Sequence, residues 1–242
     1  MRDTYRETAL DNTASIPRIL FSVLSLLAAI GVTAALTLQI SDQWLYDEFV
    51  AHEFFAYFSF QQGFGLVIVL VASGIYGLQS ARDTLALSAA RAAFVMYSIV
   101  VGLTYFVLTE AGIADTRPIG PMLWPMIVMN VVIPVYLGLE WLLNSQRAAL
   151  PWWTFFTSLS YPAVWFAITL IRGDLTGWYP FELLNPSTGW YPFELLNPSS
   201  EEASRNSFLY IGATAALFFL VSLSVMVVNR IHVVLRRSSE AS

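Results

Sequence analysis

The chain has 242 residues, of which 57% are hydrophobic and 12% are charged, with a formal net charge of −5 at pH 7. Soluble domains carry about 25% charged residues, so this chain has too little polar surface to cover a water-exposed globule. It has no cysteine, which excludes disulfides, thiolate metal sites and cysteine nucleophiles. The two histidines, His52 and His232, are far apart. We therefore expect no metal, no cofactor and no nucleic-acid partner.

Six apolar segments are long enough to cross a membrane, which takes about 20 mostly apolar residues at a rise of about 1.5 Å each. They do not alternate apolar and polar residues as the strands of a membrane barrel do. The sequence thus predicts an all-α bundle of six transmembrane helices within residues 19–231, with an arm at residues 1–18 and a tail at residues 232–242. The predicted spans are Ile19–Leu38, Phe54–Leu78, Leu87–Leu108, Leu123–Leu143, Leu150–Ile171 and Phe208–Val228.

An alternative for the first segment is a secretory signal peptide, because Val32, Thr33 and Ala34 resemble a small-residue cleavage site. The apolar run begins only at Ile19 and continues past Ala34, which fits a signal peptide poorly. We therefore expect a retained span.

Arginine placement predicts the orientation of the bundle. With six spans, the side that holds both termini carries nine of the 12 arginines, and the other side carries Arg117, Arg172 and Arg205. Because cytoplasmic loops are enriched in arginine and lysine, both termini are predicted to be cytoplasmic. The nine arginines are Arg2, Arg6, Arg18, Arg82, Arg91, Arg147, Arg230, Arg236 and Arg237.

Tryptophans near the predicted span ends, among them Trp124, Trp141 and Trp152, are expected to act as interfacial anchors. Glu140, which precedes Trp141, is expected to reach the same interface rather than to serve in a proton relay.

The predicted extracytoplasmic loop at residues 172–207 contains an exact tandem repeat, since residues 176–187 recur as residues 188–199. Two copies of 12 residues do not make a repeat architecture, which needs longer units and at least three copies. A recent duplication or a cloning or sequencing artefact explains it better. Each copy holds an amphipathic Phe-Glu-Leu-Leu turn that could lie on the membrane surface. The simpler interpretation is that one copy packs and the other extends into solvent.

Polar residues near the outer ends of the spans predict a pocket below the outer leaflet. Ser59 in the second span and Asn130 in the fourth lie at matched depths of roughly 10 Å, and His52 and Gln62 share a helix face with Ser59. Such groups usually face the bundle interior. The alternative is that they are hydrogen bonds that only hold the helices together. The predicted pocket comprises His52, Ser59, Gln62, Asn130, Arg172 and Asp174.

Several motifs together resemble the Pr-six-Pr family of bacterial six-helix membrane proteins, over roughly residues 16–231. The resemblance implies a six-helix protein of the bacterial inner membrane, in a family with one copy of the duplicated stretch and no settled activity. Its most specific part is Arg172-Gly173 followed by Gly177-Trp178-Tyr179-Pro180. The other motifs are Phe54–Ser59, Val101–Leu108, Ile133-Pro134, Leu139–Leu143 and Tyr161-Pro162.

This family is distantly similar to the androgen-induced-gene family, whose members hydrolyse fatty-acid esters with an intramembrane threonine and histidine. By that similarity the threonine corresponds to Ser59, which would be the nucleophile of a hydrolase. The histidine corresponds to Asn130, which cannot act as a general base. His52 lies seven residues before Ser59, about 10 Å along a helix, and is no substitute.

The sequence contains no phosphate-binding glycine loop, nucleophile elbow or zinc-protease motif. We therefore expect a non-catalytic membrane protein that binds a membrane lipid, a lipid-like small molecule or a membrane partner. The alternatives are an altered lipid-ester hydrolase and a small transporter, although a transporter should show inverted repeats or several charged residues at mid-membrane depth. No feature of the sequence indicates an oligomeric state.

Overall fold

The structure is a computed structural model that describes residues 16–47, 49–110, 123–144, 146–177 and 203–240. Throughout these ranges the ordered elements are helical. Six helices are long and apolar enough to cross a membrane, which confirms the predicted all-α fold with six spanning helices. The fourth span is composite, with α6, a π-helical turn η1 and α7 in succession. The helices are α2 (Ile16–Leu45), α3 (Ala51–Phe54), α4 (Phe58–Gln79), α5 (Leu85–Glu110), α6 (Trp124–Ile127), η1 (Val128–Val132), α7 (Ile133–Leu143), α8 (Trp153–Thr176) and α9 (Ala203–Glu240).

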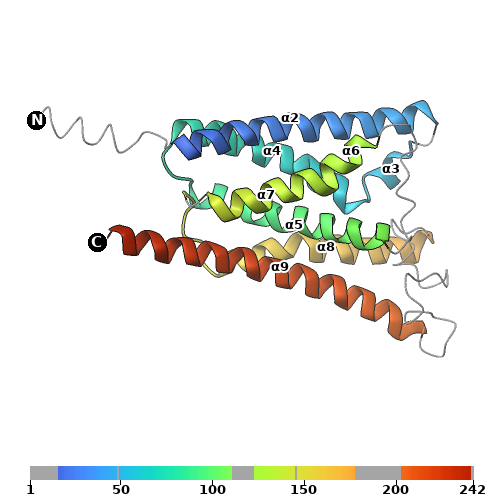
Figure 1. The fold of residues 1–242 in the computed structure, drawn as a ribbon. Helices are drawn as coiled ribbons and strands as arrows, with labels where there is room; N and C mark the ends of the chain where they lie inside the picture. The colour runs from blue at the N-terminus through green and yellow to red at the C-terminus, as the bar shows by residue number, and fades with distance from the viewer. Residues whose placement is uncertain (1–15, 48, 111–122, 145, 178–202, 241–242) are drawn as a thin grey trace, which may run out of the picture.

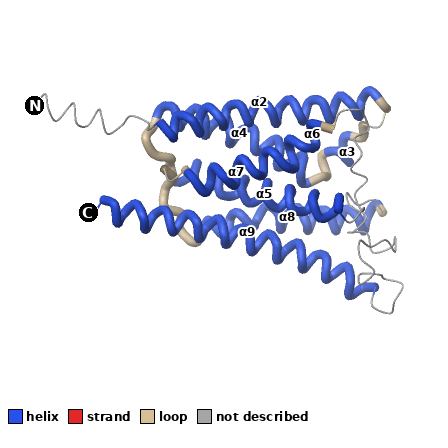
Figure 2. The backbone as a smooth tube through the Cα atoms, in the orientation of Figure 1, coloured by secondary structure: helices blue, strands red, loops and turns tan. Residues whose placement is uncertain are grey.

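The long helices lie side by side and alternate in direction (Figure 1). α2 begins and α9 ends at one end of the bundle, which we call the terminal end. The connections from α4 to α5 and from α7 to α8 lie there too (Figure 2). The other end, where α3 lies, we call the distal end. The start of α2 and the end of α9, the first and last helices among the described residues, therefore share one side, as the six-span prediction requires.

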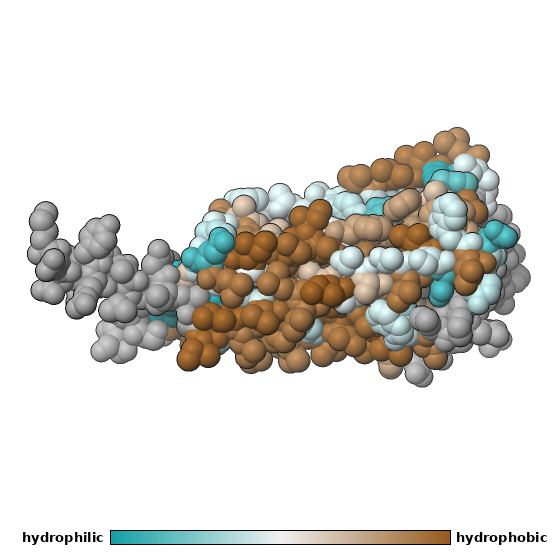
Figure 3. Space-filling view, turned by 90° about the horizontal axis from the view of Figure 1, so that it is seen from above, coloured by the Kyte–Doolittle hydropathy of each residue, from teal (hydrophilic) through white to brown (hydrophobic). Residues whose placement is uncertain are grey.

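The sides of the bundle are apolar, as Figure 3 shows for one face. Large hydrophobic side chains point outward from several helices, for example Leu27, Ile30, Ile68 and Phe106. A soluble protein rarely exposes an apolar surface of this extent, whereas hydrocarbon covers it at no cost. The architecture is that of a multi-pass membrane protein.

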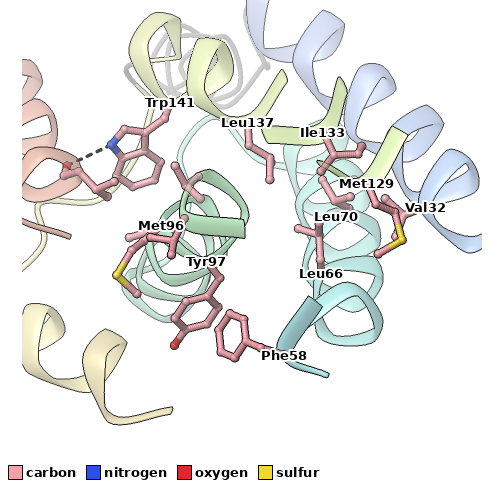
Figure 4. Packing of buried hydrophobic residues seen from close by; sticks show 14 of the residues in the cluster. Val32, Phe58, Leu66, Leu70, Met96, Tyr97, Met129, Ile133, Leu137 and Trp141 are labelled. Carbon is pink, nitrogen blue, oxygen red and sulfur yellow. Dashed lines mark hydrogen bonds between the residues drawn. The ribbon is translucent and has the colours of Figure 1, made fainter. Parts of the chain in front are cut away.

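Buried hydrophobic side chains from several helices pack against one another in the interior (Figure 4). On α4, Leu66, Leu70 and Gly74 are buried on one face, and Gln62 lies on the same face one turn earlier. Gly74 is needed for close packing, because a Cβ there would lie 2.9 Å from the backbone oxygen of Ser22 on α2. This contact holds the terminal ends of α2 and α4 together.

Several element boundaries differ from the predicted ones. The second span is interrupted after Phe54 and α4 begins only at Phe58, and α8 begins at Trp153 rather than at Leu150. The last helix continues through most of the predicted tail to Glu240. α8 ends in Gly177, whose φ of +72° is a left-handed conformation that glycine adopts without strain. The rest of the duplicated loop, residues 178–199, lies outside the described residues.

Candidate functional site

Polar groups gather at both ends of the bundle, and the distal end contains the predicted pocket residues. There, residues 55–57 separate α3 from α4. An interrupted helix at the membrane leaves backbone carbonyls that need donors. Gln61 Nε2 donates to the Phe55 oxygen at 2.6 Å, and Trp165 Nε1 of α8 donates to the Ala56 oxygen at 2.9 Å. The interruption is thus stabilised by specific side chains.

Two of the predicted pocket residues meet at this interruption. Arg172 Nη1, near the end of α8, donates to the backbone oxygen of His52 in α3 at 2.9 Å. The His52 and Asp174 side chains are exposed. Arg172 and His52, which the sequence analysis put in one pocket, thus lie at one surface, where the Arg172 side chain attaches α3 to α8.

Gln61 and Gln62 of α4 bond to different helices. The buried Gln62 accepts a hydrogen bond from Ser98 Oγ of α5 at 3.3 Å, and Gln61 Oε1 accepts one from Tyr161 Oη of α8 at 2.6 Å. Ser59, at the second position of α4, is partly buried, and its side chain makes no hydrogen bond within the described residues. Of the predicted set on α4, Gln62 is a helix-joining group and Ser59 keeps its hydroxyl available.

Asn130 lies within the π-helical turn η1, four residues before Pro134. Proline has no N–H, so Pro134 cannot donate to the Asn130 carbonyl one turn earlier. The Asn130 side chain stays within its own span, since Nδ2 donates to the Met126 oxygen at 3.0 Å. π-helical turns are frequent at functional sites.

The spans that carry Ser59 and Asn130 meet close to the predicted depth. Met129, beside Asn130, reaches α4 so closely that a Cβ on Gly63 would lie 2.8 Å from Met129 Cε. The described residues contain no direct hydrogen bond between Ser59 and Asn130. A water-bridged contact between them stays a prediction.

A cluster of aromatic rings lies below the helix interruption. The Phe58 ring centroid is 5.4 to 5.6 Å from the rings of Tyr97, Tyr161, Trp165 and Phe218, which come from α5, α8 and α9. These separations are within the range at which aromatic pairs stabilise a core. The start of α4 therefore rests on a packed base.

At the terminal end, a chain of buried ion pairs joins four parts of the fold. Arg18 Nη2 of α2 lies 2.7 Å from Asp83 Oδ1 in the α4–α5 connection. Arg91 of α5 binds the other oxygen of Asp83 through Nη1 and Glu140 of α7 through Nη2. All four side chains are at most 8% exposed. Charges at this depth are retained only when paired.

Two polar neighbours complete this network. Asn144 Nδ2 donates to Glu140 Oε1 at 2.6 Å, and Arg18 Nε donates to the Ser80 oxygen at 2.5 Å. A polar cavity of about 10 Å³ adjoins Arg18 and is also lined by Ser73, whose buried hydroxyl has no protein partner. Its size and lining suit a single water molecule.

Arg147, in the α7–α8 connection, is a further buried arginine at the terminal end, separate from the ion pairs just described. It is 1% exposed, and its Cζ lies 3.7 Å from the centroid of the Trp141 ring. Its Nη2 donates to the Trp141 backbone oxygen and lies 2.8 Å from His232 Nδ1 of α9. Because arginine only donates, His232 must accept through Nδ1.

α9 is attached to the same connection along one face. Asn229 accepts from Leu150 N at 2.9 Å and donates to the Ala148 oxygen at 3.1 Å. Trp141 Nε1 donates to the Val225 oxygen at 3.0 Å, as the dashed line in Figure 4 shows. These bonds fix the terminal half of α9 against α7 and the connection that follows it.

Two expectations from the sequence are wrong at this end. Trp141 is not an interfacial anchor, because it is 2% exposed and bonded to α9. Glu140 does not reach the interface, because it is 2% exposed and paired with Arg91. Trp124 and Trp152 are 40% and 54% exposed, as anchors should be. The anchoring rule fails where a neighbouring helix covers the span end.

Sequence reasoning missed this network because it used the arginines only to set orientation. A usable signal was present. Arg91 lies four residues after the predicted start of its span and Glu140 three residues before the predicted end of its own. Opposite charges at such similar depths beneath the same surface favour a pair, since each alone would be costly in lipid.

The ion-pair network and the surroundings of Arg147 differ in their balance of charge. The buried side chains Arg18, Arg91 and Arg147 face only two buried carboxylates, Asp83 and Glu140, which Arg18, Arg91 and Asn144 already bind. Burial lowers the pKa of Arg147 to about 9, so this group remains charged at neutral pH. Arg147 therefore carries the surplus positive charge among these five buried side chains.

No group of three or more His, Asp or Glu side chains that could hold a metal ion occurs in the described part of the chain. Comparison with protein-family profiles, with curated proteins and with solved structures finds no match to this chain.

Proposed function

We propose that this multi-pass membrane protein lies in a bacterial inner membrane, with its terminal end in the cytoplasm, and binds the polar headgroup of a lipid or lipid-like small molecule near its distal end. Orientation is supported by the nine-to-three distribution of arginines. The membrane is supported by the resemblance to the Pr-six-Pr family, of which we propose the chain is a member.

The observation that carries the binding proposal is the start of α4 at the helix interruption. No side chain caps this N-terminus, and the hydroxyl of Ser59 in its first turn makes no hydrogen bond to any residue that the structure describes. A helix N-terminus offers backbone N–H donors and a partial positive charge to a polar or anionic group. The adjacent carbonyl oxygens of Phe55 and Ala56 already accept hydrogen bonds from Gln61 and Trp165. The backbone N–H groups in the first turn of α4 therefore remain to donate to a ligand.

Binding without cleavage fits the chemistry of these groups. A serine nucleophile needs a base to take its proton. Asn130 has no basic nitrogen and donates to its own helix, while the His52 side chain is exposed. The second candidate function, a small transporter, is favoured by the interrupted second span, because transporters often bind substrate at discontinuous helices.

Photocrosslinking in proteoliposomes tests the binding proposal, using a lipid analogue with the reactive group near its headgroup. We expect labelling of the α3–α4 region that Ser59→Ala reduces. The matched control is Ser160→Ala, an exposed α8 serine bonded to its own helix. Equal labelling of wild type and Ser59→Ala would reject the site. Covalent capture of Ser59 by a fluorophosphonate would reject the non-catalytic function and support the hydrolase.

A further inference from the structure

The surplus positive charge among the buried side chains of the terminal end lies on Arg147, and two side chains of α9 lie beside it. Arg147 Nε and Nη1 are buried donors with no hydrogen-bond partner among the described residues. No carboxylate among the described residues lies within ion-pair distance of Arg147. The nearby Glu140 is bound by Arg91 and Asn144 instead. Buried guanidinium donors left without acceptors are costly, so this site is built to meet an acceptor.

A second arginine lies close to Arg147. Arg236 Nη2 of α9 donates to the Arg147 backbone oxygen at 3.1 Å, and Arg236 is partly exposed. His232, one turn before Arg236, bonds to the Arg147 guanidinium. His232 and Arg236 thus both lie beside Arg147, and both are partly exposed. A phosphate group, which has several acceptor oxygens, can accept from both arginines at once.

The position of this cluster in the membrane indicates the kind of oxyanion. Trp152 and Trp153, at the start of α8 on the same end, are each 54% exposed. Exposed tryptophans of this kind lie at headgroup level, which is also the level of lipid phosphates. Basic clusters next to a membrane span on the cytoplasmic side attract anionic headgroups.

We propose that Arg147 and Arg236 form a binding site for a phosphate group, supplied by a lipid headgroup or by free phosphate. Arg236 meets the phosphate first, and the unpartnered donors of Arg147 complete its binding. The Trp141 ring supports the Arg147 guanidinium from one face. The site joins the α7–α8 connection to α9, so an occupied site also holds α9 in place. This inference is independent of the headgroup proposal for the distal end, but it rests on the proposed cytoplasmic orientation of the terminal end.

The test uses the purified full chain in a neutral maltoside detergent, with thermal unfolding followed by tryptophan fluorescence. The probes are phosphatidylglycerol, diacylglycerol with the same acyl chains, and inorganic phosphate. A ligand that binds only the folded state raises the midpoint with concentration. We expect phosphatidylglycerol to raise it and diacylglycerol not to. An equal rise with inorganic phosphate would assign the site to free phosphate, and no rise with it would assign the site to a lipid.

The variants separate the site from general charge effects. Arg236→Gln should raise the phosphatidylglycerol concentration for a half-maximal shift by about tenfold, since it removes a charged hydrogen-bond donor. Arg147→Gln should do the same where it folds. The matched control, Arg82→Gln, removes one charge from the same end of the bundle, where Arg82 is exposed in the α4–α5 connection, and should respond as wild type. An equal shift with diacylglycerol, or a wild-type response of Arg236→Gln, would overturn the site.

Discussion

The buried ion pairs of the terminal end make a prediction that single and double substitutions can test. In the intact network, Arg18 and Arg91 are balanced by Asp83 and Glu140. Glu140→Leu leaves two arginines to share the single carboxylate of Asp83 in an environment at most 8% exposed. Arg91→Leu leaves Glu140 with Asn144 alone. Each single substitution therefore leaves an unbalanced buried charge.

The expected magnitudes follow from that imbalance. Removing one partner of a buried pair costs about 3–5 kcal/mol, so each single variant should lose that much stability. The double variant Arg91→Leu with Glu140→Leu leaves the neutral pair of Arg18 and Asp83. Its main remaining defect is the Asn144 amide, which loses its acceptor at a cost of about 1–3 kcal/mol. The double variant should thus be more stable than either single variant.

Equilibrium unfolding of the purified protein in mixed micelles, followed by circular dichroism, gives the free energies of this cycle. The coupling energy between the two sites should be at least about 3 kcal/mol, at the top of the range for residues in contact. Asp174→Asn removes an exposed carboxylate at the distal end and should change stability by less than about 0.5 kcal/mol. Additive single effects, or a Glu140→Leu loss under about 1 kcal/mol, would refute the reasoning.

Three further predictions address other parts of the chain. An impermeant maleimide should label a cysteine at Asp47 from outside the cell but not one at Arg82, and labelling of the reverse set would reject the proposed orientation. Deleting residues 188–199 should leave expression and thermal stability nearly unchanged, because doubling a loop costs only about 0.6 kcal/mol; a large loss of folded protein would show that both copies pack. Tyr97→Phe should cost about 1 kcal/mol in unfolding measurements, because Tyr97 Oη donates at 2.7 Å to the Ser158 oxygen. That carbonyl lies one turn before a proline and lacks its usual N–H partner, so an unchanged stability would show that another donor replaces Tyr97.

The sequence alone determined the fold class and the number of spans. This was possible because hydrocarbon demands that each crossing segment be apolar and satisfy its own backbone, which are local properties of about 20 residues. Local sequence was less informative where the backbone departs from a regular helix. The interruption after Phe54 depends on donors such as Trp165, which lies 109 residues later than its acceptor Ala56.

Only the tertiary structure decided which polar groups meet. Depth in the membrane can be read from sequence: it gives Ser59 and Asn130 similar depths, and it would have given Arg91 and Glu140 similar depths too. Depth does not say which helices are neighbours or which faces they turn to each other. The structure pairs Arg91 with Glu140 across 49 residues, whereas Asn130 bonds to its own helix. Partner choice is set by the packing of whole helices, and that packing is a property of the folded bundle rather than of any one span.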